Sequence, residues 1–162
     1  MIKVGILSDT HGTIHPRIVE LMNDCDYVIH AGDVMEEDSL EQINPRQRML
    51  AVRGNNDGHI ASLSDIESLD LPGGAIVVEH GHMHGHYEPS HESLRAAHPK
   101  AKAIIYGHTH VQVIDDKQSP WVINPGSAGP IRNYGGARCL LLTIENQEQW
   151  VIKPHIYDNV FS

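Results

Sequence analysis

Short apolar runs that end in the same kinds of polar residue recur along the chain. The runs are rich in β-branched residues, and each ends in Asp, Asn or His, usually beside a glycine. A short apolar run bounded by turn residues predicts a buried β-strand. Five such segments occur, at residues 4–11, 27–33, 49–57, 75–82 and 103–110. Because open α/β sheets bind ligands beyond the carboxyl ends of their strands, we expect the five ends to form one shared site.

The remaining pattern predicts a few short helices and several hairpins. Helical spacing of apolar residues and flanking prolines predict helices at residues 15–24, 35–43 and 89–99. Turn residues predict hairpins in the second half, with turns at residues 72–74, 116–119 and near 146. One sheet alone would need more helices to cover both faces. The predicted fold class is therefore α/β, with a two-sheet β-sandwich flanked by α-helices.

The composition narrows the class of protein. A length of 162 residues with 40% hydrophobic content suits a single domain over residues 1–162. The formal net charge of -9, without a cluster of Lys and Arg, argues against nucleic acid as the main partner. We expect a cytoplasmic protein with no membrane partner, because neither a signal peptide nor a long apolar run is present. Cys25 and Cys139 are predicted to be reduced thiols.

Histidine is over-represented, with 13 residues in a chain that is only 5% aromatic, and this excess points to metal. Side chains two residues apart on an extended segment point the same way, so Asp9 and His11 can hold one metal together. Asp33 follows Gly32 and is the expected bridge between two metals, and Asn55 offers a neutral oxygen. The remaining predicted ligands are His80, His108 and His110. Two adjacent divalent metals can clamp the attacking and leaving oxygens of a phosphate.

Each of these residues also has a structural explanation. Asp9 with His11, and separately Asp33, would serve as helix caps, and Asn55 suits a turn. The ligand interpretation is preferred only because five segments agree. Arg132 is either a phosphate clamp or an exposed arginine, and the sequence does not separate the two.

The histidine-rich segment 80–91 contains one expected ligand, His80. His82 is expected to line the active site or to orient a ligand. His84, His86 and His91 are expected to be loop residues. Further along the chain, residues 124–127 are expected to shape a loop near the metals, fixed by hydrogen bonds from the side chain of Asn124 to the backbone.

Taken in order, these motifs are familiar. "DTH" at 9–11, "GD" at 32–33, "GNND" at 54–57, "HGH" at 80–82 and "GHTH" at 107–110 resemble the calcineurin-like metallophosphoesterase superfamily. "SDTHG", "HGH" and "INPGS" are similar to its small YfcE-type phosphodiesterase branch. The resemblance implies one metal held by Asp9, His11, Asp33 and His110. It implies a second metal held by Asp33, Asn55, His80 and His108.

The resemblance also implies a function. It implies a binuclear metal-dependent phosphoesterase in which a metal-bridging hydroxide attacks phosphorus, and a phosphodiesterase is the preferred prediction. Two divalent ions are expected per chain, with Mn²⁺ first and Ni²⁺, Co²⁺, Fe²⁺ or Zn²⁺ as alternatives. The expected partner is a small phosphate ester, and small members of the group often form homo-oligomers. The alternatives are a non-enzymatic scaffold of the same fold, as in a eukaryotic retromer subunit, and a nuclease of the same superfamily.

One position departs from the family pattern. Many members carry a histidine after the Gly-Asn pair, where this chain has Asn56. The predicted catalytic residues are Asp33, Asn56 and His82. An amide can hydrogen-bond a phosphate but cannot supply a proton from a charged state. We therefore expect slow turnover of poor leaving groups, unless His82 or His59 takes over the proton transfer.

Overall fold

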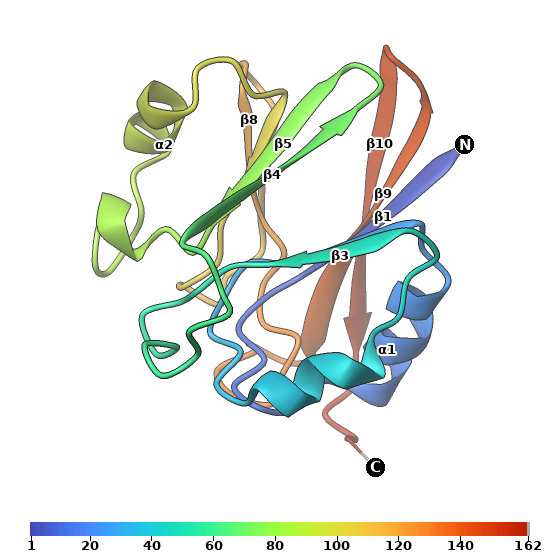
Figure 1. The fold of residues 1–162 in the computed structure, drawn as a ribbon, viewed down its shortest axis with the longest axis vertical. Helices are drawn as coiled ribbons and strands as arrows, with labels where there is room; N and C mark the ends of the chain where they lie inside the picture. Colours follow the sequence, from blue (N-terminus) through green and yellow to red (C-terminus); the bar gives the residue numbers. More distant parts are fainter. Residues whose placement is uncertain (162) are drawn as a thin grey trace.

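The computed structural model describes residues 1–161, which form two five-stranded sheets packed face to face (Figure 1). The first sheet has the order β10-β9-β1-β2-β3 and the second β4-β5-β6-β8-β7. The strands of the first sheet are β1 (Ile2–Leu7), β2 (Tyr27–His30), β3 (Arg48–Ala51), β9 (Ala137–Asn146) and β10 (Gln149–Tyr157). Those of the second are β4 (Ile66–Leu71), β5 (Gly74–Glu79), β6 (Ala103–Ile105), β7 (Val113–Asp115) and β8 (Trp121–Asn124). The predicted two-sheet sandwich is confirmed.

The main core lies between the two sheets. Ile6 of β1 and Leu140 of β9 belong to the same buried cluster as Ile76 of β5 and Ile105 of β6. Removing these side chains from water favours the face-to-face packing, since alternate residues of each strand point inward.

Two α-helices cover the outer faces (Figure 1). Helix α1 (Pro16–Asn23) packs Ile18 and Met22 against the first sheet, and α2 (His91–Ala97) packs Leu94 against the second. The short helix predicted at 35–43 forms as a 3₁₀ helix, η1 (Glu37–Gln42), which begins without a side-chain cap. So short a segment gains little from α-helical hydrogen bonds, which explains the tighter form. Within residues 1–161, every helix is too short or too polar to cross a membrane.

The topology brings the predicted ligand segments to one end of the sandwich. Strands β1, β2 and β3 run parallel to one another, as do β5, β6 and β8. Backbone hydrogen bonds then join the loops that follow them: Asp9 N donates to Gly32 O at 2.9 Å, and Gly107 N donates to His80 O at 3.0 Å. The three predicted hairpins are the antiparallel pairs β4–β5, β7–β8 and β9–β10.

The two cysteines lie buried beneath α1 and should not react in the folded protein. Burial raises the pKa of Cys25 to about 11 and that of Cys139 to about 12, so both thiols are neutral at pH 8. We expect a thiol-specific aromatic disulfide to label neither cysteine at pH 8 until denaturant is added. Labelling of one thiol per chain before unfolding would contradict the burial. The neutral thiols stabilise the fold fully below their ordinary pKa of 9.0, and this contribution declines as the pH rises toward 11.

Candidate metal centre

The five predicted ligand segments meet at one site, and their backbone there is unusual. Five of the seven predicted ligands have positive φ, between 50° and 72°: Asp9, His11, Asp33, His108 and His110. Left-handed backbone is uncommon for residues other than glycine and is concentrated at functional sites. The strands therefore end in tight turns that direct several polar side chains to one place.

The structure brings the first three ligands together. Asp9, His11 and His110 each offer one ligand atom, and these atoms lie within 4.8 Å of one another. His110 Nε2 lies 3.4 Å from Asp9 Oδ1. The rings of His11 and His110 lie 5.1 Å apart between centroids. These three residues can hold one divalent cation.

A second group forms beside the first and shares Asp9. Asp9, Asp33 and His80 also bring their ligand atoms within 4.8 Å of one another. His80 Nε2 lies 3.5 Å from Asp33 Oδ2 and 3.8 Å from Asp9 Oδ1. Asp33 also approaches the first group, because its Oδ2 lies 3.6 Å from His11 Nε2. Both aspartates therefore lie between the two groups, whereas the sequence singled out Asp33 alone as the bridge.

The facing atoms of these groups fit a metal. Among residues 1–161, eight buried side-chain nitrogen or oxygen atoms lack a hydrogen-bond partner, and four belong to this site: Asp9 Oδ1, His11 Nε2, His80 Nε2 and His110 Nε2. Buried polar atoms are almost always paired in folded proteins. Carboxylate oxygens and imidazole nitrogens that converge without hydrogen bonds are the donor set that divalent transition metals take.

In the rings of His80 and His110, a hydrogen bond at Nδ1 leaves Nε2 available to a metal. His80 Nδ1 lies 2.7 Å from Ala31 O and His110 Nδ1 lies 2.7 Å from Ile131 O, so each Nδ1 carries the proton and donates it. Burial lowers the pKa of His110 to about 4, and it also lowers the pKa of His11. A neutral ring whose Nδ1 donates, such as that of His110, presents an Nε2 lone pair to a cation.

Burial and the neighbouring charges act differently on the two carboxyl groups. Burial raises the pKa of Asp9 to about 7, although His80 and Ser8 oppose this effect. Burial also acts to raise the pKa of Asp33, but His80 and the amide groups of Asn56 outweigh it and lower the pKa. A bound cation would favour the ionised form of both carboxylates.

Three other predicted residues lie beside the two groups of candidate ligands: Asn55, Asn56 and His108. His108 Nδ1 lies 3.2 Å from Asn55 Oδ1, and its Nε2 contacts the carbonyl oxygen of His86. Asn56 donates twice to Asp33, from its backbone N at 3.1 Å and from its side-chain Nδ2 at 2.9 Å. In this structure Asn56 therefore fixes the orientation of Asp33.

His82 lies next to the predicted ligands, with its ring centroid 5.5 Å from that of His80 and 6.3 Å from that of His108. Its Nδ1 is buried without a partner. His84 contacts Ser93 and Glu79, and His91 contacts Asp115 and Tyr106. His82 thus adjoins the candidate metal centre, whereas His84 and His91 contact other parts of the protein.

Several residues that support the site were not singled out by the sequence. Asp57 is fully buried and accepts three backbone hydrogen bonds, from Val34, Met35 and Gly54. Ser8 Oγ donates to Asp9 Oδ2 at 2.7 Å. Their signal is weak, because Asp and Ser are common in ordinary turns.

The loop at residues 124–127 has the predicted hydrogen bonds from the side chain of Asn124 to the backbone. Asn124 Nδ2 donates to Gly107 O at 3.0 Å, and Asn124 Oδ1 accepts from Gly126 N at 2.9 Å. Ser127 Oγ donates to Asp9 O at 3.1 Å. This loop therefore supports both the Asp9 turn and the turn before His108.

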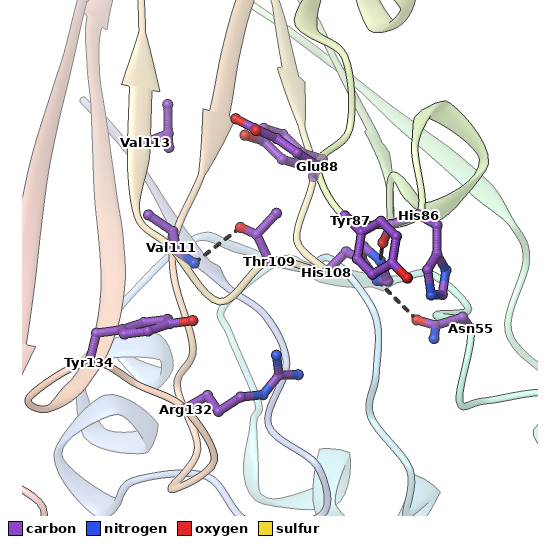
Figure 2. A pocket seen from close by; sticks show the side chains of 11 residues that line it. Asn55, His86, Tyr87, Glu88, His108, Thr109, Val111, Val113, Arg132 and Tyr134 are labelled. Atoms are coloured by element: carbon purple, nitrogen blue, oxygen red, sulfur yellow. Dashed lines mark hydrogen bonds between the residues drawn. The ribbon is translucent and has the colours of Figure 1, made fainter.

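A cavity of about 620 Å³ opens beside His108 and Asn55 (Figure 2). Its lining includes Tyr87, Tyr134 and Arg132. The positive charge of Arg132 is close enough to lower the pKa of His11 and of His110, although burial is the larger cause in both. The cavity thus adjoins the candidate metal centre, and Arg132 lies on the side nearer to it.

The comparison with protein families agrees with this geometry. The family model of the calcineurin-like phosphoesterase superfamily domain matches residues 2–147 of this chain. The chain belongs to this superfamily. A phosphodiesterase of Methanocaldococcus jannaschii is 34% identical over 142 residues, which are 76% of this chain and 82% of that protein. Phosphodiesterase YfcE of Escherichia coli is 26% identical over 152 residues, covering 78% of this chain and 79% of YfcE.

Solved structures confirm the superfamily fold. A Vps29 variant from Entamoeba histolytica superposes with a TM-score of 0.79, covering 97% of this chain and 99% of that one, at 19% identity. At this identity the likeness concerns the fold only. Membership of the metallophosphoesterase superfamily implies divalent metal ions, and Asp9, His11, Asp33, His80 and His110 form the groups that could hold them.

Proposed function

We propose that this chain is a phosphodiesterase that uses two divalent cations. One observation carries the proposal: two groups of buried ligand atoms share Asp9, and four of these atoms have no hydrogen-bond partner. Five of the predicted ligands form the two groups, and the ring of His108, which contacts Asn55, lies 5.2 Å from that of His80 between centroids. The proposed ligands are the seven predicted ones: Asp9, His11, Asp33, Asn55, His80, His108 and His110.

The residues around the metals would have separate roles. Two divalent cations would polarise the phosphate oxygens and lower the pKa of a bound water. Ser8 and the backbone N of His108 orient Asp9, and Asn56 orients Asp33. Asn56 is thus proposed as a positioning residue, and His82 as the side chain that contacts the ester. The side-chain hydrogen bond that Asn56 Nδ2 donates to Asp33 Oδ2 explains why an asparagine suits position 56.

The two sheets share one core, which supports a single domain over residues 1–162. The adjoining cavity of about 620 Å³ is in the size range that binds small molecules, which supports a small phosphate ester as substrate. Mn²⁺ is the proposed metal, because the carboxylate ligands suit it and because metal choice in a cell depends on availability as much as on affinity.

Metal removal tests the proposal. After treatment with a chelator, activity should disappear and then return when Mn²⁺, Ni²⁺, Co²⁺ or Zn²⁺ is added. Bis(p-nitrophenyl) phosphate should be hydrolysed faster than p-nitrophenyl phosphate. Elemental analysis should find two metal equivalents per chain at full activity, and one equivalent at full activity would contradict the two-metal proposal.

A scaffold without enzymatic activity is the second candidate, because the fold is shared with Vps29. The two candidates differ in one measurable respect. A folded protein that hydrolyses neither ester with any of these metals would favour the scaffold, whereas metal-dependent hydrolysis would exclude it as the sole function.

A further inference from the structure

Aromatic residues gather around the cavity beside the candidate metal centre. The chain has five tyrosines, and three of them line this cavity: Tyr87, Tyr106 and Tyr134. In a chain that is only 5% aromatic, this concentration at one place is unusual. Aromatic side chains supply large contact areas to ligands at binding sites. The cavity therefore has the lining of a binding site for an apolar, flat group.

Two of these rings are free to contact a ligand. Tyr87 is 91% exposed and Tyr134 is 58% exposed. Figure 2 shows the two rings on different sides of the cavity, with Tyr87 near His108 and Tyr134 beside Val111. Exposed ring faces at the rim of a cavity are available for stacking.

The loop that carries Tyr134 is held in a strained form. Arg132 has φ of 47° and Tyr134 has φ of 54°, a region that side-chain-bearing residues rarely adopt. The loop is fixed from both sides, because Asn133 Nδ2 donates to Gly129 O at 3.1 Å and Arg138 Nη2 donates to Tyr134 O at 3.1 Å. Strain that neighbouring contacts maintain is typical of functional loops. The strain here places Arg132 and Tyr134 on the cavity wall.

The third ring forms a rigid wall. Tyr106 is 2% exposed, and its hydroxyl lies 2.9 Å from His91 Nε2. His91 Nδ1 lies in turn 2.7 Å from Asp115 Oδ2, which also contacts Arg95 Nη2 at 3.0 Å. A ring held by such a chain of contacts cannot move aside when a ligand enters.

Two groups of opposite charge lie on opposite sides of the cavity. Arg132, near His11 and His110, lies across the cavity from Glu88 (Figure 2). Glu88 is near enough to Tyr106 to act on the pKa of its hydroxyl. A phosphate would pair with Arg132 beside the metals, and Glu88 would accept a hydrogen bond from a hydroxyl or amine at the far end.

We propose that this cavity binds a flat aromatic ring that carries hydrogen-bond donors, as in a nucleoside, on the phosphate ester. Tyr87 and Tyr134 stack on the ring and Glu88 binds a hydroxyl or amine. The proposal names the substrate class of the proposed phosphodiesterase and rests on that function.

Calorimetric binding tests this subsite without requiring turnover. Three ligands are titrated into the Mn²⁺-loaded protein: uridine 5'-monophosphate, ribose 5-phosphate, which lacks the ring, and phenyl phosphate, which lacks the sugar. The nucleotide should bind about tenfold tighter than ribose 5-phosphate, because stacking of one base contributes about that factor. Tyr87→Ala and Tyr134→Asn should each remove most of this difference and leave the affinity for ribose 5-phosphate unchanged. Asn is chosen at 134 because it tolerates left-handed backbone.

Conservative variants and a distant variant serve as controls. Tyr87→Phe and Tyr134→Phe keep the rings and should bind the nucleotide like the wild type. Val151→Ala, at a 57% exposed position of β10, should change nothing. Equal affinity for the nucleotide and ribose 5-phosphate in the wild type would overturn the subsite. Phenyl phosphate binding as tightly as the nucleotide would overturn the nucleoside assignment. Loss of hydrolysis with an intact ring preference would instead count against the proposed enzyme alone.

Discussion

Replacing Asp9 with asparagine should abolish metal binding at both groups. Asp9 Oδ1 is shared by the two groups, and an amide oxygen carries no charge to offset the cations. Substituting residues that only support metal ligands costs about 10–100-fold, so loss of a shared ligand should reduce hydrolysis by more than about 100-fold. The measurement is metal content by elemental analysis together with kcat/KM for bis(p-nitrophenyl) phosphate.

Two further variants are compared with Asp9→Asn, one as a control and one to identify the bridging carboxylate. Asp70→Asn removes an exposed carboxylate on β4 and should leave metal content and activity unchanged. Asp33→Asn decides which carboxylate is the main bridge. If Asp33→Asn loses both metals while Asp9→Asn retains one, Asp33 is the bridge, as the sequence alone suggested. Full activity in Asp9→Asn would remove the metal proposal for this residue.

Gly107→Ala should damage the site without altering any ligand. A Cβ at this position would lie 2.6 Å from Asp9 Oδ2 and would also collide with Ser8 Oγ. Both groups are buried and joined by a hydrogen bond, so neither can move without displacing Asp9. We expect a loss of about 1–3 kcal/mol in the free energy of unfolding and a drop of about 10–100-fold in metal affinity.

The same change elsewhere provides the control. A Cβ at Gly58 meets no heavy atom within 4 Å, so Gly58→Ala should leave metal affinity unchanged. Its effect on the free energy of unfolding should stay within about 1 kcal/mol. Thermal unfolding and metal titration of the two variants together separate a local collision from a general effect of replacing glycine. Wild-type metal affinity in Gly107→Ala would show that Ser8 and Asp9 adjust freely.

The fold was predictable because its strands are short, apolar and bounded by turn residues. The segments ending in Asp33 and His80 are buried strands, β2 and β5, in the positions that the sequence indicated. The short helix predicted at residues 35–43 is present as a 3₁₀ helix, because periodicity does not distinguish a short α-helix from a short 3₁₀ helix of the same composition.

The site was predictable to the level of ligand types but not of contacts. An apolar segment followed by Asp9 or His110 indicates a ligand, yet the distance between those two side chains depends on how the sheets face each other. The sequence indicated that the amide of Asn56 can bind a phosphate, but only the structure shows that this amide donates to Asp33. Tyr87 and Tyr134 lie outside the regular strands and helices, so no periodic pattern indicated that they share a cavity.

The left-handed backbone at Asp9, His11, Asp33, His108 and His110 has a consequence for the mutational tolerance of this protein. Asp, Asn and His are the residues other than glycine that accept this conformation most readily, and they are also residues that bind divalent metals. The backbone conformation and the proposed metal binding would therefore favour the same few residue types at these positions. A descendant that lost the proposed metals would still keep many of these residue types in order to fold. Its sequence would therefore continue to resemble that of a metal-dependent enzyme after the activity was lost.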